Sequence, residues 1–128
     1  MQRRKVSHKQ KKICRTLLSS LELAYGITPG TIFRSRANNH LMELRGEIDK
    51  DKVVVSFPEQ GWLRPVSIKK DSLLMFIDII YDPFIKCHFL RLLAGEVLVG
   101  FRHKKGRTVA RLVSEFEKLD LSKGSTDA

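Results

Sequence analysis

The stretch GFRHKKGRTVAR, residues 100–111, concentrates basic side chains between two apolar segments. It contains five Lys or Arg residues and one His, and it contains no acidic residue. Lys and Arg side chains bind phosphate oxygens, and the planar guanidinium of Arg also stacks on nucleobases. We therefore expect residues 102–107 to form an exposed turn that touches the phosphate backbone of a nucleic acid.

The positive charge of the whole chain is concentrated in two segments. The 128 residues include 24 Lys or Arg and 14 Asp or Glu, which gives a formal net charge of +10. Residues 1–21 hold seven of the cations and residues 102–111 hold five, and neither segment contains an acid. Because a surface that only serves solubility mixes both signs, two unmixed basic segments indicate a binding surface for a polyanion.

The sequence therefore predicts a small basic nucleic-acid-binding protein, in which an N-terminal arm and the basic turn clamp the phosphate backbone. Arginines on a predicted sheet line the surface between them, and the only Trp offers a stacking ring. Because a sheet suits unstacked bases, RNA or a single strand is favoured over duplex DNA. The candidate nucleic-acid-binding residues are Arg3, Arg4, Lys5, Lys9, Lys12, Arg34, Arg36, Arg45, Arg102, Lys104, Lys105 and Arg107, with Trp62 as the stacking residue.

The chain shows no residue pattern typical of an enzyme. Its four histidines stand in separate contexts without metal-ligand spacing, and P-loop, nucleophile-elbow and dinucleotide motifs are absent. The two cysteines are far apart and are expected to be small core hydrophobes. We therefore expect no catalytic residue, no metal and no cofactor. The alternative is a metal-dependent nuclease that uses Glu47 and Asp49, although the predicted strand TIFRSR (31–36) lacks a further acid.

The first half of the chain predicts one helix followed by strands. Apolar residues recur every four positions from about His8 to Tyr25, and Gly26 ends this helix. Residues 31–36, 40–48 and 51–57 alternate apolar and polar, which predicts a three-stranded antiparallel meander with Arg36 opposite Leu41. Val66 and Ile68 predict a short fourth strand.

The second half of the chain predicts a helical insert and an end that remains open. LLMFIDIIY (73–81) and FIKCHFLRLLAG (84–95) each fit a helix, the second with Asp82-Pro83 at its start. Residues 95–102 and 107–113 fit a β-hairpin that turns at His103–Gly106. Alternatively, residues 108–119 fit a helix with one apolar face.

These elements predict an α+β fold: a small antiparallel β-meander or partly open barrel, OB- or SH3-like, with an N-terminal helix and a helical insert. A winged-helix-like C-terminal half, with residues 97–113 as the wing, is the alternative and would favour duplex DNA. We expect a basic disordered arm (1–7), one globular domain (8–121) and a disordered polar tail (122–128). With neither a signal peptide nor a bilayer-spanning segment, the expected location is cytoplasmic, or the nucleoid or nucleus if DNA is bound.

Two short segments resemble known families. GEVLVGFRHKKGRTVARLV (95–113) resembles the last two strands of bacterial translation initiation factor one and its eukaryotic relatives. This resemblance implies an OB barrel whose basic surface binds the small ribosomal subunit. YGITPGTIFRSR (25–36) resembles a helical segment of the DNA-binding domain of the bacterial replication initiator, whereas the alternation in this chain predicts a strand. No functional residue is carried over from either family.

A function of a different class is also compatible with the sequence. A non-catalytic adaptor or regulatory protein would dock an acidic protein partner through its basic surface, or form a homodimer. The apolar segment LLMFIDIIYDPF (73–84) would serve such a partner if it is exposed.

Overall fold

The computed structural model describes residues 7–44, 47–49, 52–54, 65–82 and 86–120. Almost all of the predicted N-terminal arm and C-terminal tail therefore lies outside the described residues. The elements, in chain order, are α1 (His8–Tyr25), β1 (Ile32–Ser35), β2 (Asn39–Glu43), β3 (Glu47–Asp49), β4 (Lys52–Val54), β5 (Pro65–Ile68), β6 (Leu73–Asp82), β7 (Cys87–Ala94), β8 (Val97–Arg102), α2 (Thr108–Glu115) and β9 (Phe116–Lys118).

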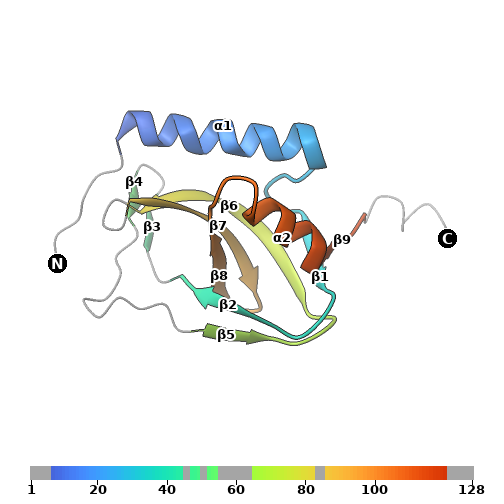
Figure 1. The fold of residues 1–128 in the computed structure, drawn as a ribbon. Coiled ribbons are helices and arrows are strands. Elements are labelled where there is room, and N and C mark those ends of the chain that lie inside the picture. Colours follow the sequence, from blue (N-terminus) through green and yellow to red (C-terminus); the bar gives the residue numbers. More distant parts are fainter. Residues whose placement is uncertain (1–6, 45–46, 50–51, 55–64, 83–85, 121–128) are drawn as a thin grey trace.

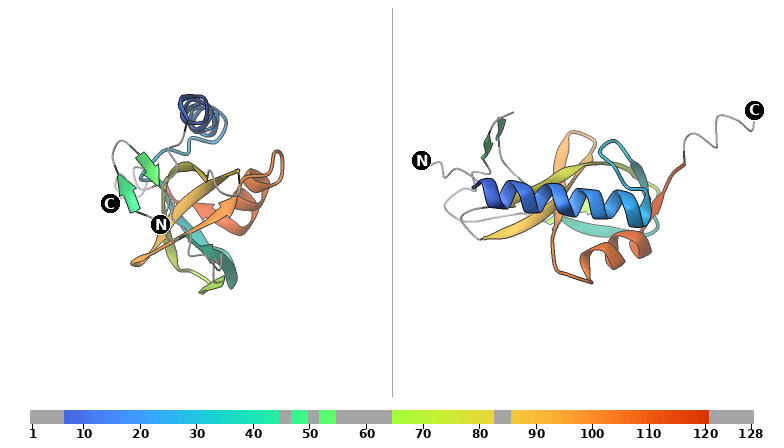
Figure 2. Two further views of the ribbon diagram at one scale, coloured as in Figure 1. Left: turned by 90° about the vertical axis from the view of Figure 1, so that its left-hand side faces the viewer. Right: turned by 90° about the horizontal axis from the view of Figure 1, so that it is seen from above.

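Seven of the strands form one antiparallel sheet in the order β5-β2-β8-β7-β6-β1-β9, and β3 and β4 form a separate hairpin. β1 and β2 are joined by only three residues, yet β6, β7 and β8 lie between them in the sheet. The sheet must curl to bring their ends together, and there the Nδ2 of buried Asn39 donates to the Oγ of buried Ser35 at 3.0 Å. Figures 1 and 2 show the resulting half-barrel. The predicted α+β class with a curled antiparallel sheet is confirmed.

The predicted three-stranded meander is wrong. β1 pairs with β6 and β9, with Phe33 opposite Leu74, and β2 pairs with β5 and β8. Alternation predicts which side of a strand is buried but not its neighbour, because any strand with a matching apolar side can pair with it. The hairpin that turns between Asp49 and Lys52 and the short strand over 65–68 are both confirmed.

The predicted helical insert is also wrong, because its two segments form the central strands β6 and β7. Periodicity alone does not separate a continuous apolar run in a strand from one in a buried helix. The three isoleucines in 77–80 favour a strand, since β-branched side chains pack well on a pleated surface. The observed sheet buries Leu74, Phe76, Ile79 and Ile80.

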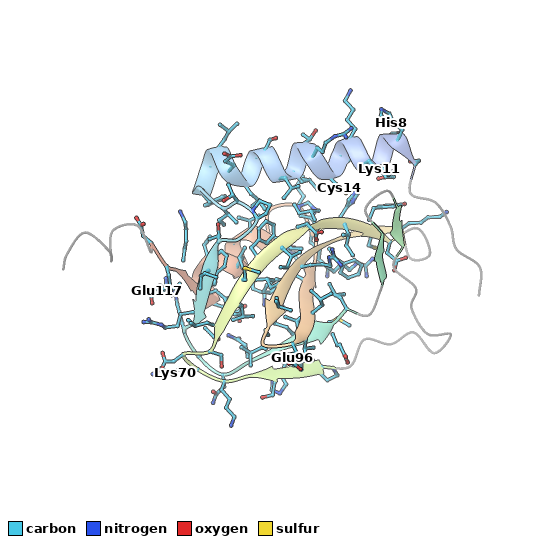
Figure 3. The ribbon with its side chains drawn as sticks, turned by 180° about the vertical axis from the view of Figure 1, so that it is seen from behind. His8, Lys11, Cys14, Lys70, Glu96 and Glu117 are labelled. Carbon is cyan, nitrogen blue, oxygen red and sulfur yellow. The ribbon has the colours of Figure 1, made fainter. Side chains whose placement is uncertain are left out.

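The predicted N-terminal helix is confirmed over His8–Tyr25. The Oγ of Ser7 accepts a hydrogen bond from the Gln10 amide at 3.2 Å and begins the helix. Gly26, with φ of 67°, ends it in the left-handed conformation, and its amide donates to the Glu22 carbonyl at 2.9 Å. α1 lies lengthwise over the sheet, and Cys14 points from it towards the strands (Figure 3).

The C-terminal region is a strand, a turn and a helix, so the helical alternative is right for residues 108–115 and the hairpin is wrong. β8 already has β7 and β2 as neighbours, and residues 107–113 therefore have no free edge of β8 to join. α2 instead buries Leu112 and then continues directly into β9. Residues 97–113 accordingly do not form the two-stranded wing of the winged-helix alternative.

A charged pair lies within the central strands. Asp78 on β6 is opposite Arg91 on β7, whose side chain is only 3% exposed. The Nε and Nη2 of Arg91 donate to the two carboxylate oxygens of Asp78 at 2.7 and 2.6 Å. Such a bidentate pair satisfies the guanidinium in place of water. Burial, with a smaller contribution from the charge of Asp78, raises the pKa of the Cys14 thiol to about 11.

Candidate nucleic-acid interface

The basic turn, residues 102–107, is held in shape by Thr108. The Oγ1 of this buried side chain accepts from the Lys104 amide at 2.7 Å and donates to the Arg102 carbonyl at 2.8 Å. The Arg107 amide closes the turn by donating to the Lys104 carbonyl at 3.0 Å. Because the backbone is tied at these points, the exposed basic side chains start from defined positions.

The basic turn forms one wall of a depression that we call the basic groove. Its volume is about 360 Å³, and it lies between β2, β8 and the start of α2. Four of the lining residues are Lys or Arg, and no Asp or Glu is among them. The lining residues are His40, Met42, Gly100, Phe101, Arg102, Lys104, Arg107, Thr108 and Arg111. A groove with this charge attracts anions, and phosphate groups match its donors.

Gly100 permits the close packing at the floor of this groove. A Cβ at this position would lie 2.1 Å from the Leu90 carbonyl oxygen and 2.6 Å from the Leu44 Cδ1. β7 and β8 approach each other too closely for any side chain here. The space beside the buried Gly100 is instead filled by the backbone of β7 and the side chain of Leu44.

Arg111 differs from the other cations of the groove because its guanidinium is fixed on several sides. Its Cζ lies 4.7 Å from the centre of the Phe101 ring, which is a cation–π contact. Its Nε donates to the Glu115 carboxylate, and its Nη2 donates to the His40 carbonyl at 3.4 Å. The side chain nevertheless stays 45% exposed.

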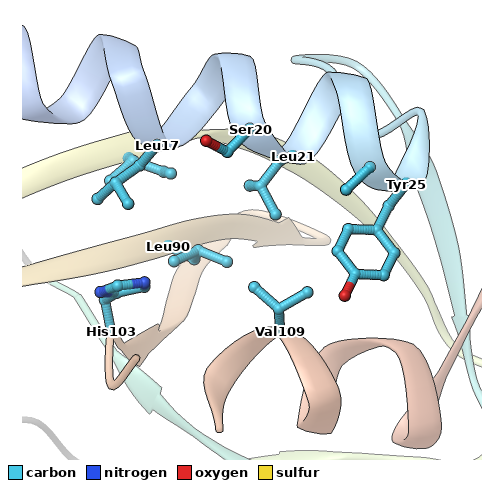
Figure 4. A pocket seen from close by; sticks show the side chains of 9 residues that line it. Leu17, Ser20, Leu21, Tyr25, Leu90, His103 and Val109 are labelled. Atoms are coloured by element: carbon cyan, nitrogen blue, oxygen red, sulfur yellow. The ribbon is translucent and has the colours of Figure 1, made fainter. Parts of the chain in front are cut away.

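An apolar pocket lies on the other side of the basic turn, between α1 and α2 (Figure 4). Its volume is about 180 Å³, and its lining includes Leu17, Leu21, Leu90 and Val109. The chain alternates between the two hollows: residues 102, 104 and 108 line the groove, whereas His103 and Val109 line the pocket. His103 therefore adds little to the charge of the groove.

Two half-buried histidines are neighbours at this point. The His103 amide donates to the His88 carbonyl at 2.7 Å. Burial lowers the pKa of both imidazoles below the ordinary value of 6.5, and in His88 the nearby His103 adds a smaller effect in the same direction. The folded protein thus favours the neutral form of both rings.

We expect the free energy of unfolding to fall as the pH is lowered from about 7.5 to about 5.5. The unfolded chain takes up protons on both imidazoles near pH 6.5, whereas the folded chain takes them up only at lower pH. Stability from the lowered pKa values is therefore complete above this range and is lost as the pH falls through it. Urea unfolding at several pH values measures how the free energy of unfolding depends on pH. The double variant His88→Gln/His103→Gln should show a weaker dependence, and an unchanged dependence would contradict the role given to the two histidines.

The structure brings together three of the sequence-predicted binding residues, Arg102, Lys104 and Arg107, in the basic groove. Lys105 is exposed at the turn but does not line the groove. Lys9 and Lys12 are exposed on α1 and do not line it either. Arg3, Arg4, Lys5, Arg45 and Trp62 lie outside the described residues.

The two described arginines from the predicted sheet platform lie near β9 rather than in the groove. Arg34 is exposed on β1, and its Nη1 lies 3.9 Å from the Glu117 carboxylate on β9. The Arg36 amide donates to the Glu115 carbonyl at 2.9 Å, which places this residue beside the end of α2. Arg36 is thus at the end of α2 that is farther from the basic turn.

Sequence reasoning missed Arg111, His40 and Phe101 as parts of the groove. The helical alternative for residues 108–119 contained the relevant signal for Arg111. It places Arg111 one turn before Glu115, a spacing that favours an ion pair on a helix. Nothing in the alternation of β2 and β8 indicates that they are neighbours, so His40 and Phe101 could not be assigned to one site.

The described residues offer no support for two of the alternatives. No group of three or more His, Cys, Asp or Glu that could hold a metal ion occurs among them, and the side chains of Glu47 and Asp49 lie outside the description. Leu73–Asp82 is strand β6, in which four of the eight apolar side chains are buried and only Leu73 is exposed, so this described part of the segment is not the exposed docking face expected of an adaptor. No described helix is long and apolar enough to cross a membrane.

Comparison with known proteins adds nothing to this geometry: no family model, curated protein or solved structure matches the chain.

Proposed function

We propose that this protein binds a nucleic-acid strand and holds its phosphate backbone in the basic groove. The observation that carries the proposal is the convergence of Arg102, Lys104 and Arg107, from one hydrogen-bonded turn, on a groove with no acidic residue among its described lining residues. Each phosphate that such a cation neutralises releases counterions, which supplies most of the binding free energy. No chemical step is required of the protein.

RNA or single-stranded nucleic acid is the preferred ligand within this proposal. The groove runs along strands β2 and β8 of a curled antiparallel sheet, and a curled sheet is the kind of surface that OB folds offer to unpaired strands. Lys9 and Lys12, which are exposed on α1, would add further positive charge for the same strand. The groove supplies the fixed part of this clamp, and the arm supplies additional charge.

The test is binding of a fluorescently labelled single-stranded RNA, measured by anisotropy at about 50 and about 200 mM salt. For the wild type we expect affinity that falls steeply with salt. The triple variant Arg102→Ala/Lys104→Ala/Arg107→Ala should bind at least about tenfold more weakly at the lower salt. The slope of the logarithm of the affinity against the logarithm of the salt concentration, which we call the salt slope, should be smaller in magnitude by about 2 to 3. Each lost phosphate contact lowers it by about 1.

The matched control is the triple variant Lys69→Ala/Lys70→Ala/Lys86→Ala. It removes the same number of charges from exposed positions that do not line the groove. If the control loses as much affinity as the groove variant, only net charge matters and the site is wrong. If the wild type binds no nucleic acid at low salt, the proposal fails, and an acidic protein partner for the basic surface becomes the better hypothesis.

A further inference from the structure

We infer that Arg111 is a stacking platform for an unpaired nucleobase, so that the basic groove selects strands whose bases are free. This inference rests on the proposed function and assigns different parts of the nucleic acid to different residues of the groove. Arg102, Lys104 and Arg107 contact phosphates, whereas Arg111 contacts a base. The distinction follows from how each guanidinium or ammonium group is already bound.

The hydrogen-bonding capacity of Arg111 is largely used within the protein. Its Nε binds the Glu115 carboxylate, which also offsets its charge, and its Nη2 reaches the His40 carbonyl. A phosphate would have to compete with Glu115 for the same donors. None of the ion pairs or side-chain hydrogen bonds found among the described residues engages Arg102, Lys104 or Arg107 in this way, so these three are the better phosphate ligands.

The guanidinium of Arg111 lies over a buried aromatic ring. Phe101 is 3% exposed, and its ring lies edge-on to the ring of buried Phe116, with the ring centres 5.7 Å apart. The guanidinium rests over Phe101 at 4.7 Å, while 45% of the Arg111 side chain is exposed. The Phe101 ring therefore covers part of the guanidinium, and exposed area remains for a ligand.

A fixed guanidinium plane favours stacking more than a freely rotating one. A base that stacks on it loses its own hydration but does not have to order the side chain, because Glu115, His40 and Phe101 already hold it. Bases in a duplex are stacked on their neighbours and expose no face to such a platform. The ligand is thus a single strand, and the preference comes from the base and not from the backbone.

The experiment compares two labelled oligonucleotides of equal length, one of adenosine residues and one with the same backbone but no bases. We expect the wild type to bind the adenosine strand about 5- to 150-fold more tightly, the range that one stacked base contributes. Arg111→Lys keeps the positive charge but replaces the planar guanidinium with an ammonium group. It should lose most of this preference while its affinity for the strand without bases and its salt slope stay unchanged.

Arg107→Lys is the matched control, because it makes the same exchange in the groove at a residue without a described ring contact. It should keep the preference for the adenosine strand. If Arg111→Lys keeps that preference too, or if the wild type binds both strands equally, the stacking role is wrong while backbone binding stands. Absence of salt-dependent binding to either strand would instead overturn the proposed function. Thermal unfolding of both variants verifies that they remain folded.

Discussion

Replacing Arg91 with methionine is expected to lower the free energy of unfolding by about 3–5 kcal/mol. Methionine fills much of the same volume but leaves the partly buried Asp78 carboxylate without its bidentate donor. A carboxylate in this position cannot recover full hydration, and it remains in the folded state as an uncompensated charge. Urea unfolding followed by circular dichroism measures the loss.

The double variant Asp78→Leu/Arg91→Met separates the missing partner from the missing volume. Replacing a buried ion pair with apolar groups of similar size is often neutral or stabilising. We therefore expect the double variant to be more stable than Arg91→Met alone, with a coupling free energy of about 1 kcal/mol or more. If the two substitutions are additive, the pair contributes nothing specific, and the assignment is contradicted.

Gly100→Ala is expected to lower the free energy of unfolding by about 3 kcal/mol, the upper part of the range for overpacking. The new methyl group would stand 2.1 Å from the Leu90 carbonyl oxygen, which belongs to the backbone of the neighbouring strand. Backbone in the middle of a sheet cannot move aside as the end of a flexible side chain can. β7 and β8 must separate locally, so hydrogen exchange of amides near Leu90 should accelerate in the variant.

The control for this prediction is Gly106→Ala in the basic turn. Gly106 has a φ of 77°, and a Cβ built there meets no atom within 4 Å. The substitution therefore adds only the cost of a left-handed alanine, about 1–2 kcal/mol. Urea midpoints rank the two variants. A loss in Gly100→Ala no larger than that in Gly106→Ala would show that the strands yield easily and that close packing does not require glycine there.

The local elements that the sequence predicted well are those whose signals are contained in neighbouring residues. The helix over His8–Tyr25 has a four-residue apolar repeat, a capping Ser and a terminal Gly, all within one segment. The basic turn was evident because four cations without an acid cannot be buried together. Hairpin β3–β4 and strand β5 likewise followed from short-range alternation.

The insert over residues 73–95 was mispredicted because its burial comes from segments far along the chain. A strand covered on both sides loses the alternation that distinguishes it from a helix. β6 is covered by α1 and paired with β1 and β7. These neighbours cannot be inferred from the amino-acid sequence of β6 itself.

The sequence by itself thus determined the N-terminal helix, the location of the positive charge and the α+β class, since each depends on composition or on contacts a few residues apart. Only the tertiary structure decided that β2 lies beside β8, because strand partners depend on long-range packing. That pairing places His40 and Met42 next to Gly100 and Phe101, and α2 then brings Arg111 over the aromatic ring. The charge was in the sequence, but the groove that positions it arises from the curl of the sheet.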